Sequence, residues 1–258
     1  MAAPSGSSGG RLTSKILVAA LTALTAAGLG LIQAGLWQPS RGQRATLVAT
    51  AALVAFVTTT GAAVGEWRSR RAEAKRDDLA LVLAGAAWAV HDLTGIDVRE
   101  LGLAVYRVRR QRLPPFGRIL ARVHRERAAR RPTTSGIVWR PGMGVIGQCV
   151  AVGADVGQDV GADSRPWLDV DPEQWPEVPE HVRAGLTYEE FAHVRGKYHV
   201  VLATPVIVDA GASSRVVGCV ALDGPEGSYD LLWTGEVRWV LADTAITLRQ
   251  FVLGGYGG

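Results

Sequence analysis

The stretch "YHVVLATPVIVDAGASSRVVGCVALDG" (residues 198–224) decides the fold of this chain. Its two halves, 198–209 and 215–224, are rich in valine and other β-branched or aromatic residues, which are enriched in strands. The small residues of the AGASS linker between them suit a hairpin loop. The stretch therefore predicts two strands joined as a β-hairpin.

The segments on either side of this hairpin complete a mixed domain. Residues 99–110, "RELGLAVYRVRR", alternate apolar and polar as a strand does, and "SGIVWR" (135–140) indicates a short strand. Between them, residues 114–131 are interpreted as a helix or an ordered basic loop, and residues 153–179 as a loop region. Residues 234–253, with Thr234 as a cap candidate, predict a closing helix.

Two apolar segments near the N-terminus each have the length of a membrane span. Residues 15–37 and 44–67 hold about 20 residues without an internal charge, enough to cross roughly 30 Å of hydrocarbon. They predict a transmembrane hairpin (15–67) after a flexible tail (1–14). A cleaved signal peptide and buried soluble helices are the alternatives.

Basic residues give the hairpin an orientation. The heavier cluster, which includes Arg68, Arg70 and Arg71, directly follows the second span. The positive-inside rule then places both termini in the cytoplasm. The coding bias towards Arg, Ala, Gly and Val resembles that of a high-GC bacterium, so we expect the protein in the cell inner membrane.

A connecting helix is predicted over residues 68–95. Leu79, Leu83 and Val90 recur at helical spacing on one apolar face, and Gly95 is a plausible stop. We expect the connecting and closing helices to make the protein a homodimer.

The stretch "RPGMGVIGQCV" (140–150) matches the G-x-G-x-x-G pattern of a dinucleotide-binding turn. That function requires a βαβ unit, but Gly153 and Gly157 interrupt the sequence where the helix would run. The glycines are better interpreted as a tight turn with close backbone packing. Cys149 and Cys219 belong to no zinc-binding pattern, and no nucleophile and base stand out, so we predict neither a metal site nor an enzyme.

Together, "VWRPGMGVIGQCVA" (138–151), the strand 198–209, the strand 215–224 and the final helix resemble the GAF domain family. The resemblance implies an α+β fold over residues 96–253, with a tail at 254–258, in which helices flank a central antiparallel sheet and a ligand pocket lies in front of it. A PAS-like domain is the main alternative. The pocket candidates that the resemblance implies are Trp139, Gly142, Gly144, Val145, Gly147, Cys149, His199 and Thr204.

Several GAF ligands do not fit this sequence. The cyclic-nucleotide signature contains Asn, which is absent here, and bilin attachment needs a Cys followed by His, whereas Val follows both cysteines. Haem would need His193 or His199 as its ligand. We therefore predict no cofactor and expect an unknown small molecule. A thiol at Cys149, if it lies near a helix N-terminus, leaves a redox response open.

Arginine crowds the segment from 107 to 131. It is interpreted as a contact with anionic lipid, as a phosphate or nucleic-acid site, or as a solvated basic face. Nucleic acid is disfavoured because the run lacks stacking aromatics. The candidates for contact with lipid or phosphate are Arg68, Arg70, Arg71, Arg118, Arg122 and Arg125.

These features predict a membrane-anchored cytosolic sensor or signalling adaptor. No output enzyme domain follows residue 253, so we expect the signal to pass through the membrane segment or a separate output protein. One alternative is a membrane effector whose hairpins assemble when ligand binds. The other is a redox-responsive GAF protein that uses Cys149.

Overall fold

A computed structural model gives the fold of the chain. The residues that it describes are 19, 22–23, 26–27, 30–36, 38, 40–111, 116–128, 136–210 and 213–253. They fall into two compact units, Met1–Glu73 and Ala74–Gly258, and the boundary lies inside one helix. The domain boundaries drawn from the sequence stay predictions.

The first unit contains the start of helix α2 (Arg41–Thr94). This helix is long and apolar enough to cross a membrane by length and composition, and none of its apolar window is buried. Among the described residues it is the one helix that meets this test. Most of the first predicted span, 15–37, lies outside the described residues, so the structure supports one apolar span and not the two-span hairpin.

The second unit is built on a five-stranded antiparallel sheet. The strand order is β2-β1-β5-β4-β3, and every neighbouring pair is antiparallel. The strands are β1 (Gly102–Gln111), β2 (Gly117–Arg127), β3 (Val156–Asp159), β4 (Val200–Ala210) and β5 (Ser213–Gly224). The expected α+β class with a central antiparallel sheet is confirmed.

Residues 136–140, the described part of the short strand expected at 135–140, form no strand. Two further segments differ from their interpretation in the sequence. The basic stretch 114–131 was expected to be a helix or loop, but it contains β2, which pairs with β1 over its whole length. The stretch 153–179 was expected to be a loop, but it contains the edge strand β3 and a short helix. In both segments, pairing with a neighbouring strand overrides weak local propensity.

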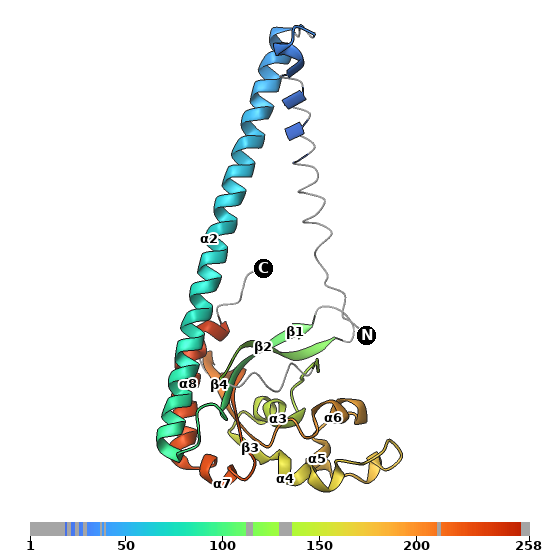
Figure 1. The fold of residues 1–258 in the computed structure, drawn as a ribbon, viewed down its shortest axis with the longest axis vertical. Coiled ribbons are helices and arrows are strands. Elements are labelled where there is room, and N and C mark those ends of the chain that lie inside the picture. The colour runs from blue at the N-terminus through green and yellow to red at the C-terminus, as the bar shows by residue number, and fades with distance from the viewer. Residues whose placement is uncertain are drawn as a thin grey trace. The chain divides into compact units, whose positions relative to one another are not determined.

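One face of the sheet carries the main hydrophobic core. Alternate residues of β1, β4 and β5, such as Leu103, Leu202 and Leu222, point to this face and are fully buried. The C-terminal part of α2, α7 (Tyr229–Leu232) and α8 (Gly235–Leu253) supply the other side of the core. Figure 1 shows the C-terminal part of α2 together with α8 along this side of the sheet. Full burial of one such leucine stabilises the fold by about 1.5–3 kcal/mol.

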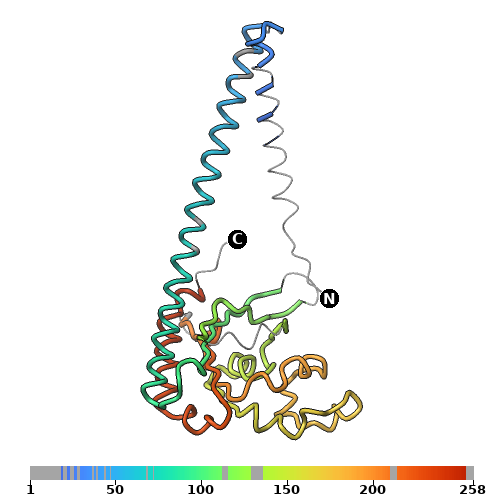
Figure 2. The backbone as a smooth tube through the Cα atoms, viewed as in Figure 1, coloured from blue at the N-terminus to red at the C-terminus, as the bar shows by residue number. Residues whose placement is uncertain are grey.

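The opposite face carries α3 (Gly144–Val152) and a segment that we call the cover segment, residues 160–197 (Figure 2, yellow to orange). The cover segment consists of short elements: α4 (Val160–Ser164), η1 (Arg165–Trp167), η2 (Trp175–Glu177), α5 (Glu180–Arg183) and α6 (Tyr188–Val194). It has a small core of its own, in which the Trp175 and Phe191 rings lie 5.1 Å apart. A capping box between Thr187 and Glu190 starts α6.

Candidate functional site

The glycine-rich turn before α3 is held by contacts within the protein. Gly142 and Gly144 have φ of 87° and 60°, which favours glycine. A Cβ at Gly147 would lie 2.2 Å from the Arg140 carbonyl oxygen, so the third glycine permits close packing. The Gly144 N–H donates to the Ala184 carbonyl of the cover segment at 2.7 Å. The turn therefore joins α3 to the cover segment, and the antiparallel β3 that follows α3 excludes a βαβ unit.

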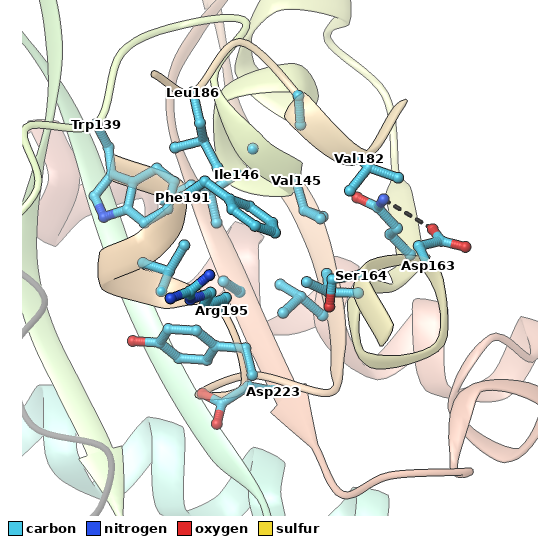
Figure 3. A pocket seen from close by; sticks show the side chains of 18 of the residues that line it. Trp139, Val145, Ile146, Asp163, Ser164, Val182, Leu186, Phe191, Arg195 and Asp223 are labelled. Atoms are coloured by element: carbon cyan, nitrogen blue, oxygen red, sulfur yellow. Dashed lines mark hydrogen bonds between the residues drawn. The ribbon is translucent and has the colours of Figure 1, made fainter. Parts of the chain in front are cut away.

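A cavity of about 100 Å³ lies between the sheet, α3 and the cover segment (Figure 3). One water needs about 10–15 Å³ by this measure, so the cavity accommodates a molecule of on the order of ten non-hydrogen atoms. Most of its wall is apolar, and Val145 and Ile146 of α3 and Phe191 of α6 contribute to it. Polar side chains such as Ser164, Arg195 and Asp223 also line it, and a mainly apolar wall with some polar groups is typical of small-molecule sites.

The sheet forms the floor of the cavity, and the residues paired across neighbouring strands there have small side chains. Ala104 of β1 pairs with Ala221 of β5, and Ala221 pairs with Ala203 of β4. Gly102 lies two residues before Ala104 on β1, where it pairs with Asp223 of β5. Since side chains alternate between faces, all four residues point to the face that α3 covers. Ala104 and Ala221 line the cavity, and their small side chains leave the space that larger ones would fill.

Asp223 reaches across this floor to the arginines of β2. Gly102 is paired with both Asp223 and Arg127, and a Cβ at Gly102 would lie 2.5 Å from Asp223 Oδ1. The carboxylate therefore passes over the glycine, and its Oδ2 lies 2.7 Å from Arg127 Nη2. Arg125 Nη2 is 4.0 Å from Oδ1. Burial raises the pKa of Asp223 even though the two arginines act to lower it.

Gln158, Asp163 and Tyr106 are further polar residues of the wall. At one end, Gln158 Nε2 donates to Asp163 Oδ2 at 2.9 Å. Figure 3 shows Asp163 on the opposite side of the cavity from Arg195 and Asp223. Tyr106 of β1 also lines the cavity, and burial raises the pKa of its phenol, which is therefore neutral at physiological pH.

The predicted pocket residues divide into three groups. Trp139, Gly144 and Val145 line the cavity. Gly142, Gly147 and Cys149 shape the turn and α3 without lining it. His199 and Thr204 do not line it: His199 Nδ1 faces Glu226 at 3.9 Å, and Thr204 turns to the opposite face of the sheet because it lies one residue after Ala203.

Cys149 does not lie where a reactive thiol was expected. It is the sixth residue of α3, a full turn beyond the helix N-terminus, and it is completely buried. It packs in the same core cluster as Cys219. A hydrogen bond with Cys149, together with burial, raises the pKa of the Cys219 thiol, which makes that thiol a poorer nucleophile.

The six arginines proposed for lipid contact also have different surroundings. The Arg68 side chain lies outside the described residues, Arg70 forms an exposed ion pair with Glu66 at 2.5 Å, and Arg71 stacks over Trp67 at 5.0 Å. Arg118 and Arg122 are exposed on β2. Arg125 differs from the others because its side chain is only 17% exposed and lines the cavity.

Sequence reasoning assigned Arg125 to lipid or phosphate contact rather than to the cavity, and it missed several polar residues of the lining, Arg195 and Asp223 among them. The signal for Asp223 was a carboxylate in a strand of otherwise apolar residues, with a glycine at the start of the neighbouring strand. Arg195 directly follows α6 and was hidden in a segment without a clear period. Among the described residues, no group of His, Cys, Asp and Glu side chains could hold a metal ion.

No family model matches this chain, and no curated protein matches it. Solved structures similar to it include a hypothetical protein from S. aureus (15% identity, TM-score 0.30, 54% of this chain and 88% of that chain). Another is the NreA protein from Staphylococcus aureus mutated in its nitrate-binding site (15% identity, TM-score 0.30, 54% of this chain and 79% of that chain). A third is the free methionine-R-sulfoxide reductase from Neisseria meningitidis in complex with its substrate (17% identity, TM-score 0.33, 70% of this chain and 94% of that chain). TM-scores at this level carry no argument about the fold or ligand of this chain.

Proposed function

We propose that this protein is a membrane-anchored sensor whose GAF-like domain binds a small molecule in the cavity beneath α3 and the cover segment. The observation that carries the proposal is the cavity itself. Paired alanines on adjacent strands leave its floor empty, and apolar side chains from α3 and α6 form its walls. An interior space of about 100 Å³ is large for a close-packed protein interior, and it suits a small molecule.

A cavity-filling substitution tests this function. Ala104→Leu adds three carbons to the floor, and we expect it to abolish the stabilisation of the full-length protein by small molecules that stabilise the wild type in a thermal-shift screen. Overpacking alone costs about 1–3 kcal/mol. Ala87→Leu is the matched control, because Ala87 is buried in the core on the other face of the sheet. Equal ligand responses in wild type and Ala104→Leu would contradict the proposal.

Membrane anchoring is the second part of the proposal. Leu53, Phe56 and Val57 of α2 are exposed, and water would solvate such a surface poorly. Threonine hydroxyls in this part of the helix donate to backbone carbonyls one turn earlier, as in Thr50 to Thr46 at 2.8 Å and Thr59 to Ala55 at 2.7 Å. Hydroxyls satisfied in this way can enter lipid.

The ends of α2's apolar run also support an anchor. Trp67 with Arg71 above its ring is the aromatic and basic pair expected where a span leaves the bilayer. We propose that residues 15–37 supply the other span and that both termini lie in the cytoplasm, on the side of the inner membrane that holds the basic cluster.

We propose that the sensor acts as a homodimer. On α8, Trp239, Ile246 and Leu253 are exposed at intervals of seven residues, and on α2, Leu81 and Trp88 are exposed at the same interval. Both helices contribute to the same core on their inner sides. Exposed apolar stripes with this spacing suit packing against the helices of a second copy.

A further inference from the structure

Arg195 brings a guanidinium group to the cavity. It is the residue at which α6 ends, where its N–H donates to the Phe191 carbonyl at 2.8 Å. Its side chain is half-buried and lines the cavity, and Nη1 donates to the carbonyl oxygen of Leu168. Figure 3 shows Arg195 among the cavity side chains, on the same side as Asp223. The carbonyl fixes the direction of the side chain but does not neutralise its charge.

Carboxylates near the cavity have other partners. Asp223 Oδ2 lies 2.7 Å from Arg127, and Asp163 accepts a hydrogen bond from Gln158 at the far end. Within the described part of the chain, no carboxylate lies within 4.0 Å of the Arg195 guanidinium. Arg125, on the same wall as Asp223, adds a second positive charge to the lining.

A charge in a largely apolar cavity is stabilised when an opposite charge pairs with it. We propose that the ligand is a small carboxylic acid whose carboxylate pairs with Arg195 and whose apolar body lies against Val145, Val182 and Phe191. The planar guanidinium can donate two parallel N–H bonds to a carboxylate. An ammonium group at the same place would meet the like charge of Arg195. This inference rests on the proposed function, because it assigns the chemistry of the ligand that the same cavity holds.

Matched probes separate the headgroup from the apolar body. Binding to the full-length protein in detergent is measured by calorimetry at neutral pH for benzoate, benzyl alcohol and benzylamine, and for hexanoate, hexanol and hexylamine. We expect each acid to bind about 10- to 100-fold more tightly than its alcohol, the range for hydrogen bonds to a charged group, and each amine to bind most weakly.

Variants assign the preference to Arg195. Arg195→Gln is expected to reduce the affinity for the acids about 10- to 100-fold and to leave the affinity for the alcohols unchanged, whereas Arg195→Lys retains part of the preference. Arg165→Gln is the control, because Arg165 is an exposed arginine of the cover segment that pairs with Glu226 away from the cavity.

Three outcomes would overturn the inference, and they differ in what they leave standing. Alcohols or amines that bind as well as the acids, with binding lost in Ala104→Leu, would refute the acid headgroup and leave the ligand cavity intact. An acid preference that survives in Arg195→Gln would refute the assignment to Arg195. If no probe binds, the acid inference fails, and if the thermal-shift screen with Ala104→Leu is also negative, the proposed function fails with it.

Discussion

Gly102→Ala tests whether Asp223 is held as described. The glycine has no positive φ, so alanine suits the backbone, and without a clash it would stabilise the strand by roughly 0.5–1 kcal/mol. Its Cβ would, however, lie 2.5 Å and 2.7 Å from the two oxygens of the Asp223 carboxylate. The carboxylate must then leave Arg127, from which it is now 2.7 Å away, with both side chains largely buried.

The size of the effect follows from this displacement. Removing one partner of a buried ion pair costs about 3–5 kcal/mol, which we expect for Asp223→Ala. Gly102→Ala moves the carboxylate without deleting it, so we expect about 2–4 kcal/mol from the same source. In the double variant the Cβ meets no carboxylate, so the loss should be smaller than that of Asp223→Ala alone by the roughly 0.5–1 kcal/mol that alanine adds to the strand. The two substitutions are thus coupled by about 2.5–5 kcal/mol.

Denaturant unfolding of the full-length protein in detergent, followed by tryptophan fluorescence, gives the four free energies of unfolding. These four proteins form a double-mutant cycle. A control cycle combines Gly102→Ala with Pro205→Ala, at a half-buried position on β4, and there the losses of unfolding free energy should add. Losses that also add for Gly102→Ala and Asp223→Ala would refute the contact between Gly102 and the carboxylate, and with it this account of the cavity floor.

Two further predictions concern charge and assembly. Because burial raises the pKa of Asp223, the folded state binds the carboxyl proton more tightly than the unfolded chain does, and the contribution of Asp223 to stability falls as the pH rises from the ordinary aspartate range through the raised pKa. Asp223→Asn should remove this fall when the free energy of unfolding is measured against pH. An unchanged pH profile in Asp223→Asn would contradict the assignment to Asp223. The substitution of both Trp239 and Ile246 by Glu should convert the dimer to a monomer, as measured by light scattering. Val152→Glu, at another exposed apolar site, should leave the dimer intact. A dimer that survives the double substitution would exclude the exposed face of α8 as the dimer interface.

The strands with strong local signals could be predicted from the sequence. The valine-rich stretch 198–224 forms β4 and β5 as a hairpin, and residues 234–253 form α8 apart from the cap position. Strand β2 was not found because its arginines and alanine give no β-branched run, and only its pairing with β1 makes it a strand. The edge strand β3 is four residues long and leaves too little pattern to recognise.

The candidate site was predictable in part. The family resemblance attaches the glycine turn to a pocket, and Gly144 and Val145 of this turn line the cavity, whereas their role in binding a ligand stays a prediction. Arg195 and Asp223 could not be found in the same way. Their position depends on cross-strand register and on the packing of the cover segment, which are long-range properties that no local period encodes.

The central claim is that the cavity beneath α3 holds a small molecule. It is tested most directly by mass spectrometry of the small molecules released on denaturing wild-type protein and Ala104→Leu protein, purified side by side from the native host. We predict that wild type releases an organic acid in near-equimolar amount and that Ala104→Leu releases none. If both proteins release the same compounds, or if neither releases any, the account of the cavity as a ligand site is contradicted.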